Sequence, residues 1–135
     1  MVNYIAVIVA AVLNTAIGAF WYSPAAFGKQ WMKLANVTEK EMQAAKKRGM
    51  GKTYAVAFIA TLVMSYVLAV MVSLANAATF VSGAIVGFWL WLGFIATVML
   101  NPVLWQNKPV KLYVLGIAHY LVVLVITGGV LAVWA

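Results

Sequence analysis

The chain has 135 residues, of which 67% are hydrophobic and 8% are charged, and its formal net charge at pH 7 is +7. A soluble domain needs a charged surface, so this composition argues against a soluble protein and predicts an integral membrane protein. The absence of cysteine excludes disulfides, thiolate metal ligands and cysteine nucleophiles.

Four apolar segments are each long enough to cross a bilayer, whose hydrocarbon core of about 30 Å needs roughly 20 helical residues. They are predicted at residues 3–22, 52–74, 80–101 and 110–134. The third is expected to end at Asn101-Pro102, because the residue before a proline disfavours helical backbone. The sequence therefore predicts one all-α membrane domain, residues 1–135, built as a four-helix transmembrane bundle.

Residues 24–49 are predicted to form an amphipathic helical hairpin outside the membrane, between the first and second spans. Ser23 is a favourable N-cap and Pro24 a favourable first helical residue. Thr38 and Glu41 have the spacing of a capping box, and Gly49 is placed to end the second helix of the hairpin. The first hairpin helix carries apolar residues on one face and lysines elsewhere, which predicts interfacial anchors at Phe27, Lys29, Trp31, Lys33 and Leu34.

The basic residues predict the orientation. All nine Lys and Arg residues fall between the first and second spans, between the third and fourth, or, as Lys52 and Lys111 do, at the start of the span that follows. The positive-inside rule then puts both basic segments in the cytoplasm and both termini on the other side. Anionic lipid headgroups, and not nucleic acid, are the expected counter-charge, with contacts at Lys46, Lys47, Arg48, Lys52, Lys108 and Lys111.

Several short blocks are distinctive. The most specific runs through Trp21-Tyr22-Ser23-Pro24, Phe27-Gly28-Lys29 and Trp31-Met32-Lys33, and others are Asn3-Tyr4, Met50-Gly51-Lys52 and Gly87-Phe88-Trp89-Leu90-Trp91-Leu92-Gly93-Phe94. Along nearly the whole chain these blocks resemble a family of small bacterial membrane proteins called domain of unknown function seventeen sixty-one. The resemblance implies a bacterial four-span protein, for which we expect a location in the inner membrane. Because that family has no assigned activity, it supplies no catalytic or binding residue.

His119 is the only histidine and lies well inside the fourth span. A polar group at that depth faces the protein interior or a water-filled cavity. Counting residues along each helix from its basic end shows which other polar or indole-bearing residues lie at a similar depth in the membrane. The candidate intramembrane polar site is therefore Asn14, Thr61, Trp89, Thr97 and His119. Two interpretations stay open: a site that binds a small ligand or relays protons, and hydrogen bonds that only fix helix packing. Trp89 and Trp91 lie near the middle of the third span, and each is either a core aromatic with a hydrogen-bonded indole or part of the wall of a ligand cavity.

Metal, cofactor and enzyme chemistry find no support in the sequence. One histidine without intramembrane carboxylates or thiols cannot complete a metal site. The only acidic side chains, Glu39 and Glu41, lie in the hairpin, and the chain has no aspartate for a Ser-His-Asp triad. We therefore expect no metal, no cofactor and no enzymatic activity.

Small residues predict close helix contacts. Gly83 and Gly87 form a small-xxx-small motif, and Ala11, Thr15 and Ala19 recur at a spacing of four on the first span. Such faces favour a homo-oligomer. The expected function is that of a non-enzymatic membrane protein acting through helix contacts, as a homo-oligomer or as an accessory to another membrane protein. The alternative is a small channel or transporter for a neutral, lipophilic or anionic solute, with its polar site around His119.

Overall fold

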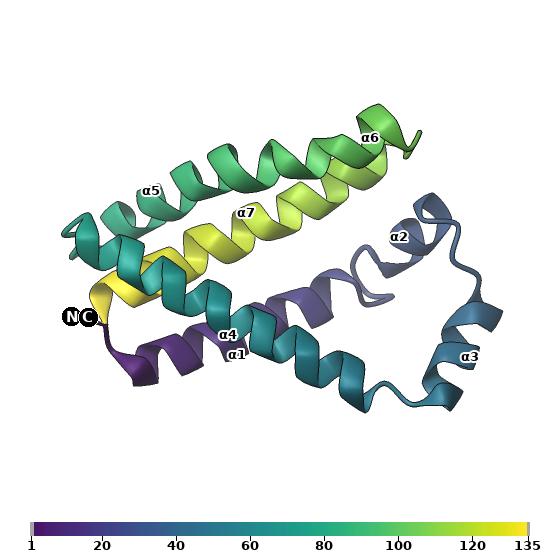
Figure 1. Cartoon of the computed structure of the whole chain (residues 1–135), viewed down its shortest axis with the longest axis horizontal. Helices are drawn as coiled ribbons and strands as arrows, with labels where there is room; N and C mark the ends of the chain where they lie inside the picture. Colours follow the sequence, from purple (N-terminus) through teal and green to yellow (C-terminus); the bar gives the residue numbers. More distant parts are fainter. Residues whose placement is uncertain (1, 135) are drawn as a thin grey trace.

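The computed structural model describes residues 2–134, and every regular element among them is a helix (Figure 1). Four helical segments are long and apolar enough to cross a membrane: Tyr4–Trp21 (α1), Gly51–Leu74 (α4), Phe80–Trp105, which begins with α5 (Phe80–Leu90), and Val110–Val133 (α7). These segments confirm the four predicted spans and give the chain the architecture of a multi-pass membrane protein.

The last helix is the centre of the bundle, because α7 contacts α1, α4 and α5. Its pairing with α1 is antiparallel: the Asn3 side-chain amide donates to the Trp134 carbonyl oxygen at 2.9 Å, and Gly18 lies against His119. These two contacts are fifteen residues apart on each helix, so the register is constant along the pair. Asn3 and Trp134 therefore lie at one end of the bundle, here called the terminal end, and α2, α3 and α6 lie at the other, the basic end (Figure 1).

The buried apolar residues gather in the half of the bundle toward the terminal end, and α4 separates from the other helices toward the basic end. The buried apolar cluster consists of Ala6, Val7, Ala10, Leu68, Ala69, Val72, Leu124, Leu131 and Ala132. On α4, every buried residue belongs to the second half of the helix, and none of residues 51–60 is buried. Figure 1 shows the first half of α4 diverging from α1 and α7 toward α3.

The closest helix contact joins α5 to α7 through glycines. A Cβ atom on Gly83 would overlap the Gly128 carbonyl oxygen, and one on Gly87 would overlap the Leu124 carbonyl oxygen. Removing the side chain is what lets the two backbones approach so closely. The predicted small-xxx-small face is thus used inside the chain.

The third span does not end at Asn101-Pro102, so that predicted boundary is wrong. After a π-helix (η1, Trp91–Ala96) and a 3-10 turn (η2, Val98–Leu100), the chain continues as α6 (Asn101–Trp105). A proline in the first turn of a helix costs little, because its missing N–H would have been unpaired there. The Val98 carbonyl that Pro102 cannot serve accepts from the Asn101 side-chain amide at 3.0 Å and from the Asn101 backbone N–H.

The first short helix after α1 also begins later than predicted. Residues 23–27 form turns, and α2 runs over Gly28–Leu34. Ser23 is not an N-cap, because its hydroxyl donates to the Phe20 carbonyl oxygen at 2.6 Å, at the end of α1. A Cβ on Gly28 would overlap the Tyr22 carbonyl oxygen, so the tight loop depends on this glycine.

The second short helix, α3 (Glu39–Arg48), has the predicted ends. The Thr38 hydroxyl accepts from the Glu41 N–H at 3.1 Å, and Gly49 follows the helix with a φ of +88°, which favours glycine. However, α3 buries none of its residues and stands apart from α2 (Figure 1). Two helices thus lie where the hairpin is predicted, but they do not pack side by side along their lengths.

Candidate functional site

His119 lies in an aromatic enclosure where the end of α1 meets α7. Only 6% of its surface is exposed, and its ring is 5.9 Å from that of Trp21, 5.3 Å from that of Tyr22 and 4.7 Å from that of Tyr120. Gly18 leaves room for the imidazole, since a Cβ there would be 3.3 Å from His119 Nε2. The register of α1 and α7 therefore places the histidine against three rings and one glycine.

Hydrogen-bonding groups at this contact are buried without partners. Among residues 2–134, no hydrogen-bond partner is found for either ring nitrogen of His119, for Nδ2 of Asn14 or for Nε1 of Trp21. Asn14 is also only 6% exposed, and Asn14, Gly18 and Trp21 recur at i, i+4 and i+7 on the face of α1 that meets α7. Leaving a buried polar group unpaired costs about 1–3 kcal/mol. Such a concentration of unpaired groups is typical of a site that holds water or a ligand.

The other residues of the predicted polar site do not join this cluster through hydrogen bonds. The Thr61 hydroxyl donates to the Ala57 carbonyl oxygen at 3.0 Å, and the Thr97 hydroxyl donates to the Gly93 carbonyl oxygen at 2.7 Å. Each hydroxyl is thus satisfied within its own helical segment. Trp89 is 63% exposed and lies on the outside of the bundle. Of the five predicted residues, Asn14 and His119 lie on the same helix contact.

Helix phase explains why Trp89 is neither a core aromatic nor a cavity wall. The face toward α7 carries residues at a spacing of four, namely Gly83, Gly87 and Trp91. Trp89 is two residues from both Gly87 and Trp91, a rotation of about 200°, so it lies on roughly the opposite side of the helix. The buried indole is that of Trp91, whose Nε1–H donates to the Ile117 carbonyl oxygen at 2.7 Å. The hydrogen-bonded tryptophan expected in this span is thus Trp91.

Trp21, Tyr22 and Tyr120, the aromatic residues of the enclosure, are absent from the predicted polar site. Trp21 follows Asn14 by seven residues, a spacing that places both on one helix face, and this pattern was the available signal. Tyr22 lies just beyond α1, and only the tertiary structure shows that its ring packs on His119.

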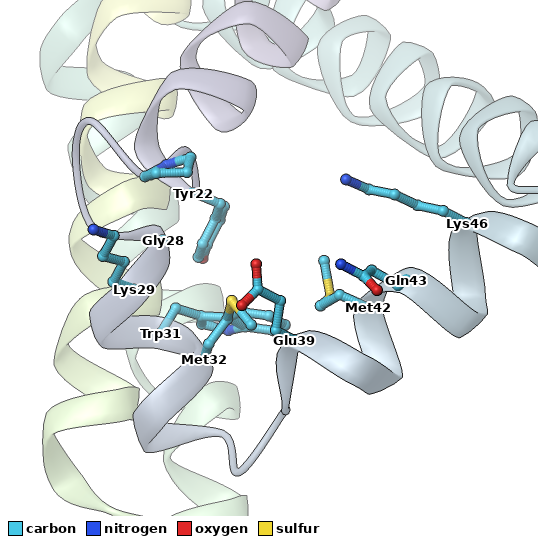
Figure 2. A pocket seen from close by; sticks show the side chains of 10 residues that line it. Tyr22, Gly28, Lys29, Trp31, Met32, Glu39, Met42, Gln43 and Lys46 are labelled. Atoms are coloured by element: carbon cyan, nitrogen blue, oxygen red, sulfur yellow. The ribbon is translucent and has the colours of Figure 1, made fainter.

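A cavity of about 930 Å³ opens between α2, α3 and the end of α1, and we call it the α2–α3 cavity (Figure 2). Tyr22 connects it to the enclosure, because its ring lines the cavity and packs on both His119 and Trp31. Burial, with a further contribution from Tyr120, raises the pKa of the Tyr22 hydroxyl, which therefore stays protonated near neutral pH. The remaining lining residues are Pro24, Gly28, Lys29, Met32, Glu39, Met42, Gln43 and Lys46.

A second cavity, of about 640 Å³, lies between α2 and the first turns of α7. The predicted interfacial anchors divide between the two cavities: Lys29 and Trp31 line the first, and Phe27, Lys33 and Leu34 line the second. The Phe27 ring also packs on Trp21 at 4.8 Å. These side chains therefore border hollows of the protein on both sides of α2, an arrangement the sequence pattern did not indicate.

The charged groups lie outside the enclosure. The predicted lipid-contacting residues Lys46, Lys47, Arg48, Lys52, Lys108 and Lys111 are all exposed, at the basic end. Within residues 2–134, no group of three or more His, Cys, Asp or Glu side chains is arranged to hold a metal ion. What the enclosure offers is neutral hydrogen bonding between aromatic walls.

Comparison with known proteins gives a family and no activity. No curated protein and no solved structure matches the chain. A family model matches residues 5–132, which is nearly the whole length. The chain therefore belongs to the family described as Protein of unknown function (DUF1761), the family that its sequence blocks resemble.

Proposed function

We propose that the chain is a non-enzymatic membrane protein that acts through helix contacts, as a homo-oligomer or as an accessory to another membrane protein. The observation that carries this proposal is the stretch of α4 before Ser65, in which no residue is buried. Val56, Ile59 and Val63 recur at spacings of three and four and form one apolar stripe, with Ile59 60% exposed. A helix of a second subunit can pack on this stripe where no helix of the same chain does.

The small-residue faces that favoured an oligomer in the sequence support it less directly. Gly83 and Gly87 are already occupied by α7, and Ala11 is fully buried inside the chain. Thr15 and Ala19 remain exposed on α1. The stripe on α4 is therefore the face that we assign to the contact between subunits.

Cysteine cross-linking tests this proposal directly, because the chain has no cysteine of its own. Single-cysteine variants Ile59→Cys and Val63→Cys are oxidised in native membranes with copper phenanthroline. If the chain forms a homo-oligomer, oxidation gives a disulfide-linked dimer. If it is an accessory to another membrane protein, a bifunctional maleimide reagent joins the new cysteine to that protein and gives a product of a different mass.

Val81→Cys is the matched control, since Val81 is also an apolar membrane position and is 67% exposed on α5. Dimer at Ile59 and Val63 in clear excess over Val81 supports the proposal. Monomer alone at all three positions, or equal cross-linking at all three, contradicts it.

We also propose an orientation in the bacterial inner membrane with the basic end in the cytoplasm. All nine Lys and Arg residues lie at that end, where the exposed ones can meet anionic headgroups, and Asn3 and Trp134 lie at the other. Alkaline phosphatase fused after residue 135 should be active, and green fluorescent protein fused there should be dark. The reverse pair of results would overturn this orientation.

A second candidate function is a small channel or transporter for a neutral, lipophilic or anionic solute. The unpaired nitrogens of Asn14, Trp21 and His119 favour it, because they offer hydrogen bonds at membrane depth. Proteoliposome swelling in glycerol, and in potassium nitrate with valinomycin, tests a neutral and an anionic solute. Rates equal to those of His119→Phe proteoliposomes in both solutions would count against transport of these solutes.

A further inference from the structure

We propose that the enclosure around His119 binds a neutral, lipophilic molecule with a flat ring and hydrogen-bond acceptors. A quinone is the simplest chemical class with these properties. The α2–α3 cavity is the entrance to this site. This inference rests on the polar site of the second candidate function and is independent of the contact on α4.

The unpaired groups determine the hydrogen bonding of the ligand. The Trp21 indole nitrogen and the Asn14 amide nitrogen can only donate, while a neutral imidazole has one donor and one acceptor. The site thus presents three donor groups and one acceptor. A ligand with several carbonyl oxygens and few donors satisfies these groups, and a ligand rich in donors leaves them unpaired.

On α1 and α7, no charged side chain lies within two turns of His119 to pair with an ionic ligand. The only charged residue on α1 or α7 is Lys111, more than two turns before His119. Lys29, Glu39 and Lys46 line the α2–α3 cavity, and Lys33 lines the second cavity. Tyr22, which covers the histidine, has a neutral hydroxyl near pH 7. Burying an unpaired ion here would cost far more than burying a neutral carbonyl group.

The walls determine the shape. Three aromatic rings lie within 6 Å of the His119 ring and already pack on the imidazole, so a flat ligand reaches the histidine by displacing one of them and stacking on the others. Of these rings, only Tyr22 also lines the α2–α3 cavity, where Figure 2 shows it near Trp31. Rotation of Tyr22 would join the cavity to the histidine.

The cavity itself suits such a molecule. Its volume of about 930 Å³ is within the range of pockets that hold small ligands, roughly 300–1,000 Å³. Met32 and Met42 give it flexible apolar walls that adapt to a ring or an alkyl tail. The cavity opens at the basic end, where α1 leaves the predicted membrane region, so a lipid-soluble molecule can reach it from the bilayer surface.

Indole N–H resonances give a direct test. The protein is labelled with nitrogen-15 at tryptophan, placed in phosphatidylcholine nanodiscs and titrated with decylubiquinone, and the Trp21 resonance is assigned by its loss in Trp21→Phe. We expect a saturable shift of Trp21. Trp105, an exposed tryptophan on α6, should show no saturable shift.

Two variants test the hydrogen bonds separately. His119→Phe keeps the ring and removes both nitrogens, and Asn14→Leu keeps the size and removes the amide; each should raise the concentration for half-saturation at least tenfold. Thr61→Val is the control and should leave it unchanged, because the Thr61 hydroxyl is satisfied by Ala57. Both site variants should be at least as resistant to thermal unfolding as the parent, since each removes an unpaired buried group.

Several results would overturn the inference. A Trp21 resonance that does not move, or that moves without saturation as Trp105 does, means that no site exists for this ligand class. Unchanged half-saturation in both variants means that the unpaired nitrogens do not bind the ring. A Trp21 shift caused by phosphatidylglycerol nanodiscs and not by decylubiquinone would assign the cavity to a lipid headgroup. Swelling assays that fail while Trp21 binding persists would reject transport and leave this site intact.

Discussion

Replacing Gly87 by alanine should separate α5 from α7. The new Cβ atom would overlap the carbonyl oxygen and carbon of Leu124. These are backbone atoms of a helix and cannot rotate away as the end of a side chain can, so the two helices must move apart. Overpacking of this kind costs about 1–3 kcal/mol, and the higher helix propensity of alanine offsets up to about 1 kcal/mol. We expect Gly87→Ala to lower the free energy of unfolding by about 2 kcal/mol.

Gly93→Ala is the matched control, because a Cβ on Gly93 has no atom within 4 Å. It receives the same new methyl group in the same span without the overlap, so its unfolding free energy should stay within about 1 kcal/mol of the parent. Unfolding by dodecyl sulfate in mixed micelles, followed by circular dichroism, measures both variants. Equal unfolding free energies for Gly87→Ala and Gly93→Ala would refute the close α5–α7 contact.

Two further changes probe single hydrogen bonds. Trp91→Phe removes the hydrogen bond to the Ile117 carbonyl oxygen and should lower the unfolding free energy in the same assay by about 1 kcal/mol. Trp89→Phe, on the exposed side of the helix, should change the unfolding free energy little. An equal loss in both variants would contradict the assigned orientation of the two tryptophans. Asn3→Ala removes the N-cap of α1 and its bond to the Trp134 carbonyl oxygen, so the first turn should fray at a cost of about 1 kcal/mol. Hydrogen exchange of the amides of residues 5 and 6 measures that fraying, and unchanged protection would show that Asn3 does not cap the helix.

Local signals predicted an element end where no competing hydrogen bond intervened. Thr38 and Gly49 delimit α3 as expected, because capping involves only neighbouring backbone groups. The expectation failed at Ser23, whose hydroxyl bonds back to α1, and at Asn101, whose side chain serves the carbonyl that proline leaves unpaired. In both places a short polar side chain had two possible partners, and the sequence pattern did not distinguish them.

The candidate site was predicted only in part for a related reason. Asn14 and His119 were predicted because they are polar residues deep inside apolar spans, and the structure buries both. The depth of a residue along its helix follows from counting, but the direction it faces depends on how neighbouring helices are rotated. That rotation places Trp89 outside and Trp91 inside, and it brings Trp21 and Tyr22 against His119.

The amino-acid sequence by itself determined the four apolar spans, their ends to within a few residues at most places, and the collection of positive charge at one end of the bundle. Each of these follows from the side chain's own preference for hydrocarbon or water, residue by residue. Only the tertiary structure decided that α7 is central, that Gly83 and Gly87 pack within the chain, and that the aromatic end of α1 encloses the histidine. Those outcomes depend on steric fit between helices distant in sequence, a property of pairs of surfaces that no single segment encodes.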